Sequence, residues 1–266
     1  MGPDKKYQLA DNFITGLEQY HGHKTISSFN YLSFNGCFFY GCIVIDGHSF
    51  RIETVTGSGT IISEERKVPV FNQISLKGSG KVILTRGENQ TVRVNTDDNI
   101  LPHIQTEVEN GKLVIFHERK NLRPTVLKFH ITVANLEGVS ISGSGDINGN
   151  DKFNSDRFYS DVDGSGDIAI KVSANRLESS ISGSGSIYLA GSTNSYDATI
   201  TGSGDVDAFE LRARDLSVVI TGSGNCRISV ADKLRVKITG SGDVLYKGYP
   251  EIDQTITGSG SVKDRN

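Results

Sequence analysis

The sequence Ile-Thr-Gly-Ser-Gly-Asp-Val at residues 200–206 decides the fold, because it returns almost unchanged at residues 220–226 and 238–244. Nine copies of its Gly-Ser-Gly core occur along the chain, beginning at Gly57, Gly78, Gly143, Gly164, Gly183, Gly202, Gly222, Gly240 and Gly258. The intervals between copies are 21, 65, 21, 19, 19, 20, 18 and 18 residues, and 65 is close to three periods. Such a repeat indicates one extended body of stacked units, where a length of 266 residues alone would suggest about two domains.

Two columns of apolar residues accompany the tripeptide. The residue two positions before it is always apolar: Val55, Leu76, Ile141, Val162, Ile181, Ile200, Ile220, Ile238 and Ile256. The residue two positions after it is apolar or a thiol: Ile61, Val82, Ile147, Ile168, Ile187, Val206, Cys226, Val244 and Val262. Polar residues alternate with these positions, and a period of two predicts strands whose apolar side faces a core. We expect both columns to point inward.

A period of 18–21 residues is too short for two helices, so the pattern predicts an all-β parallel β-helix, or solenoid, with one coil per period. About ten coils at ~4.8 Å each would form a rod of roughly 45–50 Å. The two glycines of each tripeptide are expected on the inward side or at a corner, where a side chain does not fit or a positive φ is needed.

The domain is predicted to span residues 46–266, with a less regular segment at 81–136. Residues 82–85 and 91–94 flank a turn and suggest antiparallel strands, and Asn110-Gly111 between two short apolar runs is a strong hairpin signal. Residues 97–103 suggest a short helix. The sequence leaves open whether this segment continues the coils or forms hairpins packed on them.

Residues 1–45 lack the repeat and are interpreted as a leader or an extension. The apolar run 29–45 is short and polar for a membrane span, but it contains Phe39-Tyr40-Gly41-Cys42, which resembles a bacterial lipobox except for the bulky Tyr40. In that interpretation the leader is a signal peptide and Cys42 is the lipidation site of a lipoprotein. A plain N-terminal extension is the alternative.

Charge and composition argue against several functions. The chain has 28 basic and 31 acidic residues and no basic block, so we expect no nucleic-acid partner. We expect it to contact a membrane only through a lipid anchor. The three cysteines and six histidines show no metal-ligand spacing, so we expect no metal and no cofactor. Cys226 replaces an apolar residue in an inward column and is expected to be a buried, inert thiol.

The stretch 65–80, followed by residues 107–115 and 139–147, resembles the bacterial "putative auto-transporter adhesin head GIN domain" family over roughly residues 46–266. The fold that this resemblance implies is a right-handed parallel β-helix. The function that it implies is that of an exported adhesin or binding scaffold of the cell envelope or surface, in the periplasm, at the outer membrane or outside the cell. The resemblance carries over no catalytic residue.

The candidate binding residues are polar side chains that flank the Gly-Ser-Gly corners of successive coils on the outward face: Thr201, Ser203, Asp205, Thr221, Ser223, Thr239, Ser241 and Asp243. We expect them to bind a glycan, an envelope component or a protein, without catalysis, and the coil ends could pair two copies of the chain. The alternative is a carbohydrate-active lyase or hydrolase that uses Asp146 and Asp167 on adjacent coils. We expect the aspartates beside the corners to hydrogen-bond the backbone of their own turn, and we prefer this role to catalysis.

Overall fold

The computed structural model describes residues 44–45, 48–49, 53–117 and 121–266. The chain divides into two compact units, Met1–Phe50 and Arg51–Asn266. In the first unit, β1 (Val44–Ile45) and β2 (His48–Ser49) form a small antiparallel sheet. Residues 1–43, which include Cys42 and most of the predicted leader, lie outside the described residues.

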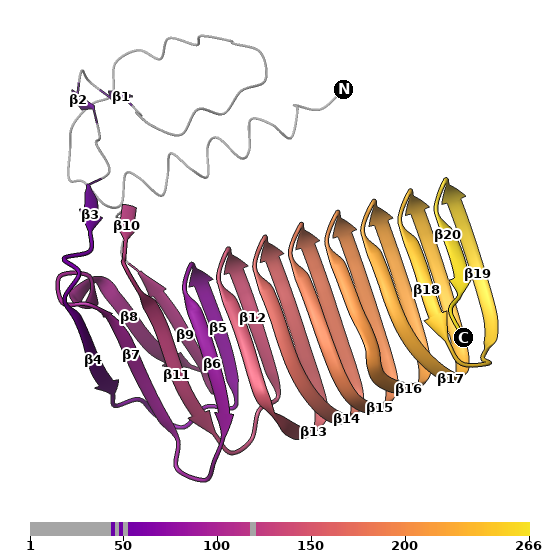
Figure 1. Cartoon of the computed structure of the whole chain (residues 1–266), viewed down its shortest axis with the longest axis horizontal. Coiled ribbons are helices and arrows are strands. Elements are labelled where there is room, and N and C mark those ends of the chain that lie inside the picture. Colours follow the sequence, from indigo (N-terminus) through magenta and orange to yellow (C-terminus); the bar gives the residue numbers. More distant parts are fainter. Residues whose placement is uncertain (1–43, 46–47, 50–52, 118–120) are drawn as a thin grey trace, which may run out of the picture. The chain divides into compact units, whose positions relative to one another are not determined.

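The second unit is a parallel β-solenoid of about seven turns, which confirms the predicted fold class and lowers the predicted number of coils from ten. Each long strand runs through nearly a whole coil and pairs in parallel with the next one, as Figure 1 shows. The coils from residue 138 onward contain five long strands: β13 (Asp146–Gly164), β14 (Asp167–Gly183), β15 (Ser186–Gly202), β16 (Asp205–Gly222) and β17 (Asn225–Gly240). They also contain four short strands: β12 (Gly138–Gly143), β18 (Asp243–Lys247), β19 (Glu251–Gly258) and β20 (Ser261–Asp264).

The inward columns stack in register through these coils. Ile200 pairs with Ile220, which pairs with Ile238, and all three side chains are fully buried. The second column is also buried from Ile147 to Val244. Burying an aliphatic side chain contributes roughly 1.5–3 kcal/mol relative to leaving it exposed, so each buried member of the two columns stabilises the fold.

Both glycines of each corner are required, for two different reasons. Gly222 has a φ of +128°, and a Cβ there would collide with the carbonyl oxygen of Gly202 in the coil before. Gly224 has no such φ, but its Cβ would collide with the carbonyl oxygen of Gly204. The corners are also joined directly, since the amide of Ser223 donates to the Gly202 carbonyl oxygen at 2.8 Å. The predicted roles of the glycines are confirmed.

The N-terminal end of the solenoid carries an antiparallel hairpin. β5 (Gln73–Gly78) pairs with β12 on one side and with β9 (Lys112–His117) on the other, and β9 pairs with β8 (Ile104–Glu109). Asn110 and Gly111 at its turn have φ values of +51° and +75°, as a two-residue hairpin turn requires. This hairpin is confirmed, and the helix expected at 97–103 is a single 3-10 turn, Leu101–His103.

The other expected strand pair is wrong. β6 (Lys81–Arg86) and β7 (Thr91–Asp97) do not pair with each other, because β11 (Leu127–Val133) lies between them, parallel to β6 and antiparallel to β7. On its other side β7 pairs with β4 (Ile61–Arg66). The chain does reverse direction at residues 87–90. The residues of this turn carry no information about β11, which is distant in sequence and inserts between the two strands.

The first Gly-Ser-Gly copy also departs from the prediction. It does not form a coil corner: β3 (Thr54–Thr56) before it pairs with β10 (Asn121–Arg123), and β4 after it is antiparallel to β7. Ile61 is 43% exposed and does not face the core, whereas Val55 is partly buried and packs against it. At the other end, Ile256 in the last described coil is 37% exposed.

Instead, this first copy is held by the buried carboxylate of Asp97. The amide of Gly59 donates to Oδ1 and the amide of Thr125 donates to Oδ2, both at 2.8 Å. Burial alone would raise the pKa of Asp97, but the hydrogen bonds from Gly59 and Thr125 outweigh it and hold the pKa below its usual value. One carboxylate thus joins the segment around residue 59 to the segment around residue 125.

We expect the variant Asp97→Asn to unfold at a temperature several degrees lower than wild type at pH 7. Because the folded-state pKa lies below the unfolded value, the carboxylate contributes stability above about pH 4 and loses it as the pH falls through the folded-state pKa. The gap between the two melting temperatures should therefore close toward pH 2, as measured by far-UV circular dichroism. A gap that is constant across this range would contradict the assignment.

Candidate functional site

The predicted binding residues form an exposed row along the corners, which we call the corner row: Thr201, Ser203, Asp205, Thr221, Ser223, Thr239, Ser241 and Asp243. The threonines stack in register, Thr201 beside Thr221 and Thr221 beside Thr239. All of these residues are exposed except Asp243, which is partly buried. The structure brings them together on one edge of the solenoid, and binding by them stays a prediction.

The acidic members of the corner row join one coil to the next. Asp205 Oδ1 accepts hydrogen bonds from the amide and side chain of Asn225, at 2.9 and 3.0 Å, and Asn225 Oδ1 accepts from the amide of Asp243 at 3.2 Å. Ser261 and Lys263 donate to the Asp243 carboxylate, at 2.6 and 3.1 Å, and these hydrogen bonds hold the pKa of Asp243 below its usual value. These hydrogen bonds are structural. They join Asp205 and Asp243 to the following coil, whereas the sequence predicts bonds to the backbone of each residue's own turn.

The carboxylates named for the enzymatic alternative belong to the same ladder. Asp146 and Asp167 are paired in register on adjacent coils, and Asp167 Oδ1 accepts from the amide of Ser186 at 3.0 Å. Neither residue lines the groove described next. The pair therefore lies outside this groove, and Asp167 is already engaged with the following coil.

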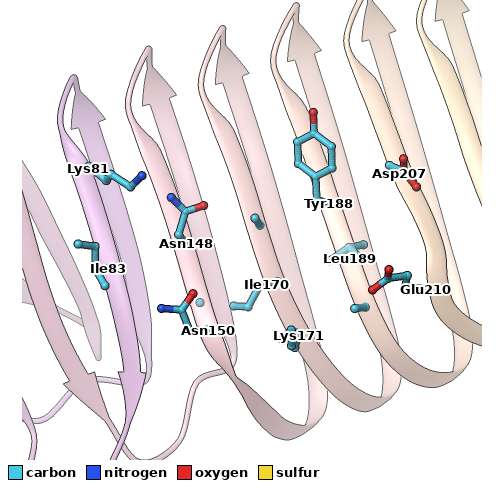
Figure 2. Close-up of a pocket in the computed structure, with 13 residues that line it drawn as sticks. Lys81, Ile83, Asn148, Asn150, Ile170, Lys171, Tyr188, Leu189, Asp207 and Glu210 are labelled. Atoms are coloured by element: carbon cyan, nitrogen blue, oxygen red, sulfur yellow. The ribbon is translucent and has the colours of Figure 1, made fainter.

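A groove of about 710 Å³ lies on the outer surface of the strand segments that follow the corners. Figure 2 shows its residues spread over neighbouring coils, with Lys81 and Asn148 toward one end and Asp207 and Glu210 toward the other. Its remaining lining residues are Ile83, Gly149, Asn150, Ala169, Ile170, Lys171, Tyr188, Leu189 and Ala190. The groove therefore crosses β6, β13, β14, β15 and β16.

Differences in coil length explain why the surface is hollow here. The coils that begin at Gly164 and Gly183 each contain 19 residues, whereas those that begin at Gly143 and Gly202 contain 21 and 20. The extra residues are absorbed as register shifts, in β13 between Asn148 and Lys152 and in β16 beside its pairing with Tyr188 and Ala190. Two short coils thus lie between two longer, bulged ones.

The lining combines small, aromatic and charged side chains. Ala169 and Ala190 have small side chains in the middle of the groove, and Tyr188 beside them is 49% exposed. Arg227 Nη1 lies 3.3 Å from Asp207 Oδ2 and neutralises that carboxylate. Lys81, Lys171 and Glu210 supply the other charges. An exposed aromatic ring among amides and charges can bind a ligand that is both flat and polar.

A second hollow, of about 570 Å³, lies on the strand segments that precede the corners, and its polar groups satisfy one another. Tyr159 donates to Gln73 Oε1 at 2.8 Å, and burial, with the nearby carboxylates of Asp161 and Glu137, raises the pKa of Tyr159 to about 12. Arg176 bridges Glu178 and Asp197, at 2.8 and 3.0 Å. Burial raises the pKa of Asp161, although the hydrogen bond from Ser180 and the charge of Lys112 act against it. These groups already have partners on the protein.

Other chemistry has little support in the described residues. No group of three or more His, Cys, Asp or Glu side chains is arranged there to hold a metal ion. Cys226 is fully buried in its column. Burial raises the pKa of its thiol, so the thiol stays protonated, as expected of a buried and inert cysteine. Among the same residues, no helix is long and apolar enough to cross a membrane.

Comparison with known proteins gives a consistent picture. Residues 70–250 match the sequence model of a family described as "Putative auto-transporter adhesin, head GIN domain". No curated protein matches the chain. The solved structures that resemble it include a "putative adhesin" from Bacteroides fragilis, with a TM-score of 0.75 and 25% identity over 79% of this chain and 100% of that one. They also include a "putative lipid binding protein" from Parabacteroides distasonis, with a TM-score of 0.69 and 26% identity over 80% of this chain and 100% of that one.

Proposed function

Because the chain belongs to the family described as "Putative auto-transporter adhesin, head GIN domain", we propose that it is an exported, non-enzymatic protein that binds a ligand at the bacterial cell envelope or surface. The observation that carries this proposal is the groove over β14 and β15. This groove lies where two short coils are flanked by longer, bulged ones, and it contains a half-exposed tyrosine. The corner row is a second candidate surface, and none of its residues lines the groove.

The use of the acidic side chains supports binding over catalysis. Glycoside hydrolysis needs two carboxylates on either side of a bound sugar, one to protonate the leaving group and one to act as nucleophile or base. Asp146 and Asp167 stand outside the groove, and Asp167 is already bonded to the following coil. Within the groove, the carboxylates of Asp207 and Glu210 lie toward the same end, and Asp207 is paired with Arg227.

Export and binding are tested separately. Antibodies against the full chain should detect it outside the cytoplasm after fractionation of cells that produce it naturally. The labelled full chain, added to cells from which its gene has been deleted, should be retained on intact cells or on isolated envelopes. A protein found only in the cytoplasm, or one that is not retained and instead cleaves envelope polysaccharide, would contradict the proposal.

We expect Cys42 to be the anchor in the lipoprotein form of this proposal. A cysteine that follows a lipobox receives acyl chains, and two or more chains anchor a protein stably where one does not. Metabolic labelling with a palmitate analogue should mark the chain, and Cys42→Ser should abolish the label and release the protein from the membrane fraction. Cys37→Ser is the matched control and should retain the label. An unlabelled wild type in its own host would eliminate the anchor and leave export to be judged by fractionation alone.

A further inference from the structure

The groove over β14 and β15 also indicates what class of ligand binds there, an inference that rests on the binding function proposed above. We propose that it holds an extended oligosaccharide that runs along the stack of coils, with a sugar ring against Tyr188.

The sheet beneath the groove offers no edge to a peptide. β14 pairs with β13 on one side and with β15 on the other, and β15 pairs in turn with β16, so these strands have hydrogen-bonded neighbours on both sides. A peptide that binds by strand addition needs an unpaired edge. A peptide therefore cannot add a strand to β14 or β15, and the side chains that line the groove are the main groups available to a ligand.

Tyr188 offers a flat apolar surface next to an open floor. In register, Ala169 lies beside Tyr188 on the preceding coil and Asp207 lies beside it on the following coil. Ala169 has only a methyl group to place beside the ring, and Tyr188 is half-exposed. A sugar ring has one face made largely of C–H groups, which packs on an aromatic ring while the hydroxyls remain at the rim.

Polar side chains stand at both ends of the groove, where the hydroxyls of a sugar chain would lie. Asn148 and Asn150 each offer an amide donor and a carbonyl acceptor, and Asp207 and Glu210 offer acceptors. Lys171 adds a donor near the middle. A sugar hydroxyl both donates and accepts, so this mixture matches it, whereas a lipid tail would leave these groups without partners.

The length of the groove favours a chain over a single sugar. The groove crosses five stacked strands, and at about 4.8 Å per strand this corresponds to about 19 Å. One sugar residue in an extended chain advances by about the height of one coil, so successive residues would meet equivalent positions on successive coils. Ala190 lies in a neighbouring row across the strands, paired with Lys171 on the preceding coil and with Glu210 on the following one, and its small side chain leaves the space between them open.

The test uses the full chain and cells or envelopes that retain it. Periodate, which cleaves the vicinal diols of sugars, should abolish retention, whereas proteinase K treatment of the same cells should leave it intact. The polysaccharide isolated from these cells should bind the chain in solution. Tyr188→Ala should weaken that binding at least tenfold, and Tyr188→Phe, which keeps the ring, should stay within about threefold of wild type. Tyr249→Ala removes a tyrosine that is 88% exposed outside the groove and should change nothing.

The outcomes separate this inference from the proposed function. Retention that survives periodate and is lost after proteinase K would overturn the oligosaccharide inference and leave the binding function standing, as would retention by vesicles of envelope lipid alone. Polysaccharide binding that Tyr188→Ala does not weaken would overturn the groove as its site. A chain that no cell or envelope retains would remove the proposed function itself. Equal melting temperatures of the tyrosine variants would show that any loss of binding is not a loss of folding.

Discussion

Ile220→Asp is expected to unfold the solenoid or bring it close to unfolding. Ile220 is fully buried between Ile200 and Ile238, so the variant loses an aliphatic contact with both neighbouring coils and places a carboxyl group where no donor is provided. The combined cost should be at least about 5 kcal/mol, which is comparable to the whole stability of many domains. Denaturant unfolding followed by circular dichroism measures it directly.

The adjacent residue provides the matched control. Thr221 is exposed on the same strand, one position further along, and its side chain points away from the core. Thr221→Asp should therefore change the free energy of unfolding by less than about 0.5 kcal/mol. Similar losses in the two variants would mean that inward and outward positions are not distinguished, contrary to the stacking described above.

Gly222→Ala is expected to destabilise almost as strongly, although it adds only a methyl group. The φ of +128° at this position is strained for any residue with a side chain, and the new Cβ would collide with the backbone of Gly202, which cannot turn aside as a side chain could. Backbone strain and overpacking together should cost about 3–6 kcal/mol.

Ser223→Ala is the corresponding control, because it changes the exposed residue at the tip of the same corner. Its amide still donates to the Gly202 carbonyl oxygen, so its free energy of unfolding should stay close to that of wild type. A stable Gly222→Ala protein would show that the corner has room that the structure does not give it.

The sequence predicts most of the solenoid because each coil repeats the same local chemistry. Aligning the repeats with one another predicts that Ile200, Ile220 and Ile238 pair in register. The same alignment predicts that Gly222 and Gly224 have no room for a side chain. Where the repeat is absent, prediction succeeds only for local signals. Asn110-Gly111 closes a hairpin by its own backbone preference, and it is found where expected.

The two errors of strand pairing and coil position are non-local. β11 separates β6 from β7, and no turn residue near residues 87–90 could report a strand from residues 127–133. The Gly-Ser-Gly at 57–59 looks like the others in sequence, yet its neighbours are β10, β7 and the carboxylate of Asp97, so Ile61 is exposed.

The groove was not among the predicted sites, although the sequence contains a signal for it. The intervals 21, 19, 19 and 20 place two short coils between two longer ones, and Ala169 and Ala190 occur on the short coils at outward positions. The sequence instead predicts the corner row as the binding site, because its residues repeat from coil to coil. A binding site in a repeat protein is also recognised by where the repeat is broken.

The most direct test of the account compares two arginine substitutions on outward positions of neighbouring coils. Ala190→Arg fills the floor of the groove, whereas Thr221→Arg places the same side chain on the corner row. Affinity for the polysaccharide isolated from retaining cells should fall at least tenfold in Ala190→Arg and should remain within about twofold of wild type in Thr221→Arg. The reverse result, with binding lost only in Thr221→Arg, would place the ligand on the corner row and contradict the account.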